Sequence, residues 1–192
     1  MDVNAFFKSQ LDEHQEVLAA TRESLAKPFE KLVHVCLKAA RGGGKIVFFG
    51  NGGSAADSQH LAAELTVRLK KDRAPIPAIA LTTDASALTA IGNDLGFDEL
   101  FARQVQALVR PGDAAIGFST SGESANVIKG LNAALDIGAA AAGFCAGKGG
   151  AMADVCDPIL LVPAADTARI QEMHITLGHM LCGALEVELG LL

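Results

Sequence analysis

A histidine and a glutamate four positions apart follow a glycine-rich turn in the segment GNGGSAADSQHLAAEL, residues 50–65. On a helix, His60 and Glu64 would share one face about 6 Å apart. An imidazole and a carboxylate at that distance could bind a metal ion together, or could divide acid and base roles between them. The pair could equally face solvent. Leu61 and Leu65 have the same spacing, so the pair adjoins the apolar stripe of the helix.

A second group of polar side chains lies in the segment ARIQEMHITLGHML, residues 168–181. The group consists of Arg169, Gln171, Glu172, His174 and His179, and four of these five could bind a metal ion or a substrate, or transfer protons. The spacing alone does not choose between the two histidines. In a helix, Glu172 and His179 stack on one face, whereas Gln171 and His179 are offset by about 80°.

Two loops of small residues share one design. The sequences FFGNGGSAADS at 48–58 and GFSTSGESANV at 117–127 each contain an apolar strand end, a small polar loop and a helix start. Ligands bind beyond the carboxyl ends of parallel strands, and a helix N-terminus favours an anion. We therefore predict that the hydroxyl-bearing residues of the second loop hold a phosphate; they are Ser119, Thr120, Ser121 and Ser124. Helix capping is the alternative, but one cap needs a single hydroxyl.

The predicted phosphate site does not resemble a nucleotide site. The chain has no GxxxxGK[ST] sequence, because isoleucine follows the lysine of GGGKIV. The stretch GNGGSA lacks the third glycine of the dinucleotide fingerprint, and only Asp72 stands near the position of an acidic ribose ligand. A small sugar phosphate is therefore the better candidate for the ligand.

The elements that must position these residues alternate along the chain. Strand-like apolar runs occur at KIVFFG, PAIAL, AAIGF, AAAGFC and PILLV. Helices are expected at roughly 53–70, 98–109, 122–136 and 167–189. Alternation of helices with fully apolar strands predicts a parallel sheet covered on both faces. Two more helices are expected before Gly42, so the prediction is one α/β domain with a helical N-terminal extension.

Composition excludes several classes of protein. The chain has 192 residues, half of them apolar, and a net charge of −6 without a basic tract, which argues against nucleic-acid binding. No apolar run approaches the roughly 20 residues needed to span a bilayer, and the N-terminus is too polar for a signal peptide. The cysteines lack metal-site spacing and are expected to be reduced and buried; they are Cys36, Cys145, Cys156 and Cys182. We expect a soluble cytoplasmic protein.

The sequence resembles the sedoheptulose 7-phosphate isomerases (phosphoheptose isomerases) of the sugar isomerase (SIS) domain superfamily over nearly its whole length. The blocks that carry the resemblance are GNGGSAADSQHLAAEL, PAIALTTDASALTAIGNDLGF, GDAAIGFSTSGESANVIKGL and ARIQEMHITLGHML. The resemblance implies a single SIS domain with three α/β/α layers and a mainly parallel, flavodoxin-like sheet of five strands. Residues 1–42 would form the N-terminal helical extension, and residues 43–192 the sugar-phosphate isomerase domain.

The resemblance also implies an activity and a set of site residues. Family members convert sedoheptulose 7-phosphate into D-glycero-D-manno-heptose 7-phosphate, the first step toward the activated heptoses of bacterial surface glycans such as lipopolysaccharide. The residues that match the family's substrate-binding positions are Asn51, Gly52, Gly53, Glu64, Asn93, Asp94, Ser119, Thr120, Ser121, Ser124 and Gln171. Those that match its zinc ligands, with one zinc ion per subunit, are His60, Glu64, Gln171 and His179. The positions of the family's catalytic pair are occupied by Glu64 and His179.

These residue types suit the reaction that the resemblance implies. Moving a carbonyl from C2 to C1 requires removal of a proton beside it, which Glu64 could accept, while His179 could move protons on the oxygens. A bound zinc ion would polarise the carbonyl. Family members are homotetramers with active sites at subunit interfaces, so Gln171 and His179 need not come from one helix face of one chain.

The sequence departs from the family pattern at a few positions. Glu123 stands where many relatives have asparagine, which puts a negative charge beside the proposed phosphate loop, and Cys145 and Ala146 stand where threonine or a similar residue is common. Two alternatives come from the same superfamily: a non-enzymatic protein that associates with the replication initiator, and a sugar-phosphate-sensing regulatory module. The presence of Glu64 and His179 favours the enzyme.

Overall fold

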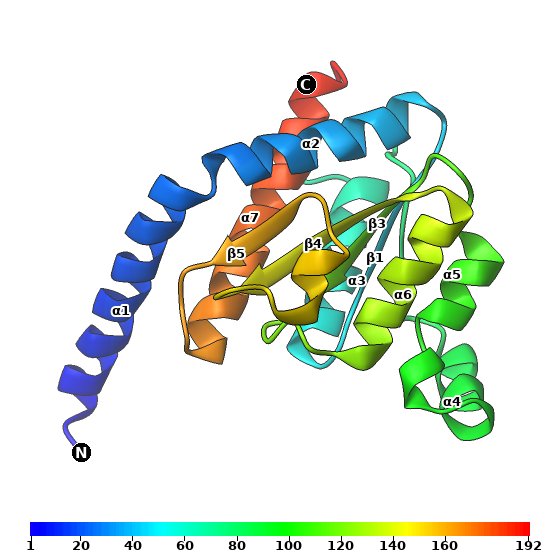
Figure 1. Ribbon diagram of the computed structural model, residues 1–192. Helices are drawn as coiled ribbons and strands as arrows, with labels where there is room; N and C mark the ends of the chain where they lie inside the picture. Colours follow the sequence, from blue (N-terminus) through cyan, green and yellow to red (C-terminus); the bar gives the residue numbers. More distant parts are fainter.

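The computed structural model describes residues 1–192, in which two N-terminal helices precede a sheet whose strands alternate with helices (Figure 1). The helices are α1 (Val3–Ser24), α2 (Ala26–Arg41), α3 (Gly53–Thr66), α4 (Ala85–Asp94), α5 (Ala102–Leu108), α6 (Ala125–Ile137) and α7 (Thr167–Glu188), with the short 3-10 helices η1 (Phe97–Glu99) and η2 (Gly150–Asp154). The strands are β1 (Ile46–Gly50), β2 (Ala78–Ala80), β3 (Ala114–Phe118), β4 (Ala140–Ala146) and β5 (Ile159–Val162).

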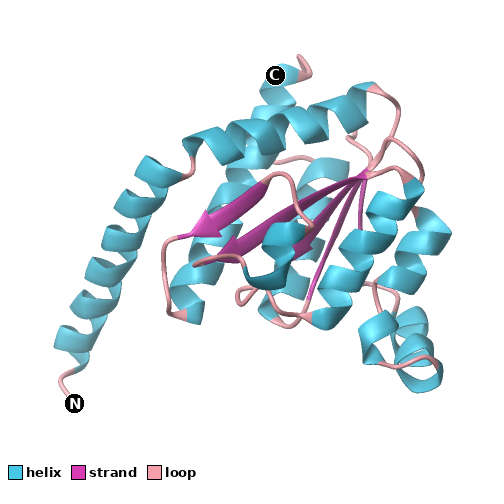
Figure 2. Ribbon diagram, viewed as in Figure 1, coloured by secondary structure: helices cyan, strands magenta, loops and turns pink.

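Helices cover both faces of the sheet (Figure 2), and alternate residues of β1 pack against the two layers. Ile46 and Phe48 pack into a core with residues of α2, α3 and α7. Val47 and Phe49 pack on the opposite face with residues of α5 and α6. Both faces of the sheet are therefore buried, which explains why its strands are apolar at every position.

The strands are all parallel and lie in the order β2-β1-β3-β4-β5, which is the flavodoxin-like order. The pairing of Gly50 with Phe118 shows that β1 and β3 end at the same level. The chain then leaves β1 toward α3 on one face and leaves β3 toward α6 on the other. Ligands bind at such a switch point. The turn of Asn51, Gly52 and Gly53 after β1 (the glycine turn) and the loop of Ser119, Thr120, Ser121 and Ser124 after β3 (the hydroxyl loop) therefore lie side by side where a ligand is expected.

The structure confirms the predicted three-layer α/β domain, its five strands and the helical N-terminus. Two elements were not expected, namely α4 and η2. Ile91 is the single buried residue of α4, so this helix lacks the apolar periodicity by which a helix is recognised in sequence.

Helix α1 extends away from the sheet (Figure 1). Its apolar side chains are largely exposed, with Phe6 at 51%, Phe7 at 62% and Leu11 at 53%. An amphipathic helix that exposes aromatic side chains has a surface suited to a partner. None of the helices has the combination of length and apolar character that a membrane span requires.

The four cysteines are buried and form no disulfide. Burial raises the pKa of the Cys156 and Cys182 thiols to about 12. Such thiols stay protonated at neutral pH and are poor nucleophiles. The prediction of buried, reduced thiols is confirmed.

Candidate active site

The turn after β1 brings the backbone close to the start of α7. Gly52 has φ 56° and ψ −121°, a conformation that residues with a side chain rarely adopt. A Cβ on Gly53 would lie 2.7 Å from Nε2 of Gln171. Glycine at this position therefore lets the Gln171 amide pack against the first turn of α3. The structure thus brings three of the predicted substrate-binding residues together.

Helices α3 and α7 run side by side in the same direction, because their N-terminal ends meet at this turn and their later turns also touch. A Cβ on Gly178 would come within 2.6 Å of a Leu61 methyl carbon. Glycine at position 178 lets the two helices approach closely. One residue away from this contact on each helix, Nε2 of His60 lies 2.7 Å from Nε2 of His179.

Glu64 completes a cluster with the two histidines. Its Oε1 atom lies 3.5 Å from Nε2 of His60. One ligand atom from each of His60, Glu64 and His179 lies within 4.8 Å of the others. The side chains of His60 and Glu64 are 48% and 19% exposed, so a ligand can reach them. Two imidazoles and one carboxylate form a donor set of catalytic zinc sites, and the residues present therefore fit a zinc ion.

Gln171 is not part of this cluster within one chain. It lies eight residues before His179, which is roughly 12 Å along the axis of α7. The structure therefore gathers three of the four predicted metal ligands and places the fourth at the glycine turn.

The structure separates His174 from His179. His174 is wholly buried, and its ring lies edge-on to the rings of Phe118 and Phe144. Burial lowers its pKa to about 4, although a hydrogen bond with the Cys145 carbonyl opposes this shift. The ring is therefore neutral at pH 7, and its Nε2 donates to that carbonyl at 3.1 Å. His174 belongs to the core, which leaves His179 as the histidine of α7 that reaches the candidate site.

Two other polar residues of α7 hold α1 in place. Arg169 donates to the backbone carbonyl of Gln10 at 2.6 Å and to the Glu172 carboxylate. The other oxygen of Glu172 lies 2.7 Å from Nδ1 of His14. Arg169 and Glu172 therefore have a structural role within the chain.

The hydroxyl groups of the loop after β3 converge. Ser119 Oγ lies 2.9 Å from Ser124 Oγ and 3.4 Å from Ser121 Oγ, with Thr120 between them in the chain. Ser124 is the N-cap residue of α6, but its side chain makes no capping hydrogen bond. The loop therefore has more hydroxyl groups than helix capping uses, at the N-terminus of a helix of 13 residues. This arrangement suits an anion.

The two loops are joined by a pair of asparagines. Asn51 Nδ2 donates to Asn126 Oδ1 at 2.8 Å, and Asn126 Nδ2 donates back to Asn51 Oδ1 at 2.9 Å. The side chain of Asn51, predicted to bind substrate, thus fixes the glycine turn against the hydroxyl loop. Asn126 was not selected from the sequence, although both loops contain one asparagine near the helix start.

Asn93 and Asp94 lie apart from the other predicted residues. Both are exposed at the end of α4, where Asn93 donates to Asp94 at 2.7 Å. Neither forms a hydrogen bond with the hydroxyl loop or with the histidine cluster.

Glu123 is engaged by a neighbouring loop. Its Oε1 atom accepts a hydrogen bond of 3.1 Å from the backbone N–H of Ala151, at the start of η2. The two other unusual residues, Cys145 and Ala146, are buried in β4. The charge of Glu123 is thus held by the Ala151 backbone amide beside the hydroxyl-bearing loop.

Asp57 was overlooked in the sequence. It stands three residues before His60 and seven before Glu64, so all three lie on one side of α3. Burial raises the pKa of Asp57, and the nearby imidazoles of His60 and His179 partly lower it. Its Oδ2 atom is buried without a hydrogen-bond partner. The helical spacing was the signal that could have identified it.

Comparisons with known proteins show the family to which the chain belongs. The SIS domain family matches residues 10–146. The chain is 53% identical over 186 residues to the phosphoheptose isomerase of Paramagnetospirillum magneticum, covering 97% of each chain. Its structure is similar to that of the phosphoheptose isomerase from Neisseria gonorrhoeae, with a TM-score of 0.91, 40% identity, and coverage of 96% and 99% of the two chains. The corresponding enzyme from Francisella tularensis has a TM-score of 0.92 at 31% identity, with coverage of 96% of this chain and 98% of that one.

Proposed function

Because the chain belongs to the phosphoheptose isomerases of the SIS domain family and is therefore an isomerase, we propose that it converts sedoheptulose 7-phosphate to D-glycero-D-manno-heptose 7-phosphate. The observation that carries this proposal is the convergence of His60, Glu64 and His179 on the helices beside the hydroxyl loop. His60 lies seven residues along α3 from Gly53, or roughly 10 Å. That separation suits a substrate with a phosphate at one end and a carbonyl at the other.

The phosphate end is assigned to the hydroxyl loop. Ser119, Ser121 and Ser124 present their hydroxyl groups together, and the N-terminus of α6 adds a favourable dipole. Binding the phosphate far from the reacting carbons holds the sugar in place for proton transfer. Gly52 and Gly53 let the backbone approach the substrate closely, and Gln171 supplies an amide at the same turn. Asn93 and Asp94 complete the proposed substrate set.

The proton transfers are assigned to Glu64 and His179. Glu64 takes the proton from C1 of the ketose and returns it to C2, which converts the ketose to the aldose through an enediol. The Glu64 side chain is 19% exposed, so its carboxylate is accessible to a substrate. His179 moves protons between the two sugar oxygens, for which an imidazole is suited near neutral pH.

We assign one zinc ion per subunit to His60, Glu64 and His179, with Gln171 from a neighbouring subunit as the fourth protein ligand that the family resemblance implies. A bound zinc ion would polarise the substrate carbonyl. Asp57, with its half-buried carboxylate nearby, adds negative charge that favours a cation at this position. His60 and His179 must be neutral to bind the metal, so zinc affinity should decrease at acidic pH.

We further propose a cytoplasmic homotetramer with active sites at subunit interfaces. The exposed apolar face of α1, with Phe6, Phe7 and Leu11, supports burial of this helix against another subunit. Because Asn93 and Asp94 lie apart from the site residues in one chain, a neighbouring subunit is a suitable source for them. Free buried cysteines are typical of proteins in a reducing compartment. The product would enter the synthesis of activated heptoses for surface glycans such as lipopolysaccharide.

The test is an assay of sedoheptulose 7-phosphate isomerisation, with and without a chelator. We expect turnover that the chelator abolishes and that added zinc restores. A folded protein that gives no product with zinc present would refute the proposed isomerase activity. It would favour the non-enzymatic protein or the sugar-phosphate-sensing module instead. Turnover unaffected by complete metal removal would refute the zinc assignment alone.

A further inference from the structure

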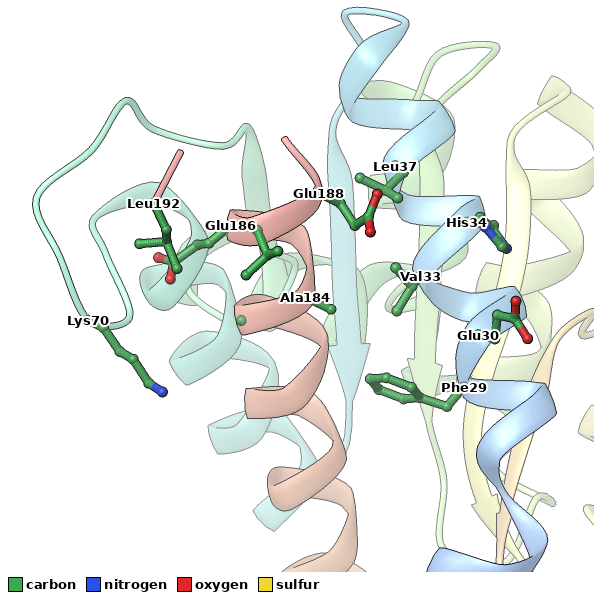
Figure 3. Close-up of a pocket in the computed structure, with 12 residues that line it drawn as sticks. Phe29, Glu30, Val33, His34, Leu37, Lys70, Ala184, Glu186, Glu188 and Leu192 are labelled. Atoms are coloured by element: carbon green, nitrogen blue, oxygen red, sulfur yellow. The ribbon is translucent and has the colours of Figure 1, made fainter. Parts of the chain in front are cut away.

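A buried ion pair joins the segment after α3 to the end of α7. Arg73 Nε lies 2.9 Å from Glu186 Oε1, and the two side chains are 1% and 0% exposed. Glu186 lies in the wall of a cavity of about 620 Å³ between α2 and α7 (Figure 3). Burying two charges costs free energy that apolar residues of similar size would not cost. The pair is therefore not explained by stability alone.

Arg73 holds the C-terminal end of α3. Its Nη2 donates to the backbone carbonyl of Glu64 at 2.8 Å, and its Nη1 donates to that of Leu65 at 2.7 Å. The last carbonyls of a helix have no hydrogen-bond partner within the helix. A guanidinium can donate hydrogen bonds to them, and its positive charge interacts favourably with the negative end of the helix dipole. Arg73 thus binds the main chain of Glu64, the residue assigned as the base.

Glu186 lies in the last turn of α7. It stands seven residues after His179, about two turns or roughly 10 Å along nearly the same helix face. The Oε1 atom that pairs with Arg73 also accepts a hydrogen bond of 3.1 Å from the backbone N–H of Leu69. One carboxylate therefore ties α7 to the segment that leaves α3 by two directional bonds.

We propose that Arg73 and Glu186 are positioning residues that fix the register of α3 against α7, and thereby hold His60 and Glu64 opposite His179. Apolar packing sets how closely the helices approach, but it is non-directional and does not by itself fix their register. A guanidinium bonds in several fixed directions at once, which a lysine ammonium cannot do. The catalytic consequence rests on the proposed isomerase activity, and the consequence for metal binding rests on the proposed zinc site.

Two variants test the proposal. Arg73→Lys keeps the charge but loses the planar fork, and the double variant Arg73→Met/Glu186→Met removes both charges without leaving one unpaired. For both, we expect zinc to bind at least about 10-fold more weakly, as is typical when residues that orient metal ligands are changed. This is measured with zinc alone, by competition with a chromophoric chelator. We also expect kcat to fall about 10-fold while KM changes little, because neither variant alters the hydroxyl loop to which the substrate phosphate is assigned.

Lys45→Met is the matched control. It breaks a different ion pair, between the partly exposed Lys45 and the buried Asp113 at the start of the sheet, in which neither residue belongs to α3 or α7. It should lower the thermal midpoint but leave zinc affinity and kcat unchanged. The same loss of zinc affinity in this control would overturn the proposal, because it would reflect general destabilisation.

A folded double variant with wild-type zinc affinity and wild-type kcat would also overturn the proposal. Should the double variant fail to fold, Arg73→Lys decides by the same criteria. A wild-type protein that binds zinc but does not isomerise sedoheptulose 7-phosphate would refute the proposed function, and the zinc comparison between variants would still test the positioning role.

Discussion

Replacing His174 by glutamine should remove an acid-sensitive part of the stability of the fold. His174 is wholly buried, and burial lowers its pKa from 6.5 to about 4. In the unfolded chain the imidazole has its ordinary pKa, so between these two values the unfolded state binds a proton that the native state does not bind. The stability gained by burying the neutral ring is therefore intact above pH 6.5 and is lost as the pH falls toward 4.

The size of the effect follows from the two pKa values. Each pH unit between 6.5 and about 4 corresponds to about 1.4 kcal/mol of unfolding free energy. The loss is therefore about 2 kcal/mol at pH 5 and about 3 kcal/mol at pH 4. Glutamine can still donate an N–H to the Cys145 carbonyl, as His174 does, but it does not titrate. The contribution of the glutamine to the unfolding free energy should therefore be independent of pH.

Urea unfolding at pH 7, 6 and 5 measures this difference, at one protein concentration because assembly shifts apparent stability. The advantage of the wild type over His174→Gln should shrink by about 2 kcal/mol from pH 7 to pH 5. The exposed His34 provides the control, since His34→Gln should show no such trend. A difference between wild type and His174→Gln that does not change with pH would refute the argument that burial holds the ring neutral.

Four further predictions concern the site and the assembly. Glu64→Gln keeps the shape of the side chain but removes the base, so kcat should fall about 100-fold or more; a folded variant with normal turnover would exclude Glu64 from that role. Replacing Ser121 and Ser124 with alanine should raise KM for the sugar phosphate, because uniform binding is lost, and an unchanged KM would leave this loop as a helix cap only. Gly53→Ala puts a Cβ 2.7 Å from the Gln171 amide, so it should displace this side chain and raise KM in steady-state assays; normal kinetics would mean that Gln171 does not need this position. Light scattering at micromolar concentration should give about four times the chain mass of 19.8 kDa, and a fully active species at 19.8 kDa would contradict interfacial active sites.

The layout of the sheet could be read from local sequence. Runs such as IVFFG and AAIGF are apolar at every position. This pattern is typical of strands that are covered on both faces of the sheet. Because parallel strands end at the same edge, the small-residue loops after β1 and β3 could be placed together before any contact was known. The weakly apolar α4 escaped this reasoning, since only Ile91 faces the core.

The candidate site depended on contacts that no local pattern contains. Helical spacing placed His174 and His179 on different faces of α7, but nothing in the spacing says which face meets the core. The structure decided this by packing His174 against Phe118 and Phe144. His60 and His179 are separated by 119 residues, and their rings meet where α3 and α7 pack in parallel.

The sequence by itself therefore determined the fold class, the strands, and the residue types available at the sheet edge. Through the family resemblance, it also indicated the candidate site residues. Only the tertiary structure decided the rotation and register of α3 against α7, because the hydrophobic effect that drives helix packing is non-directional. Gly178 sets how closely these helices approach, and the Arg73–Glu186 pair ties their ends together.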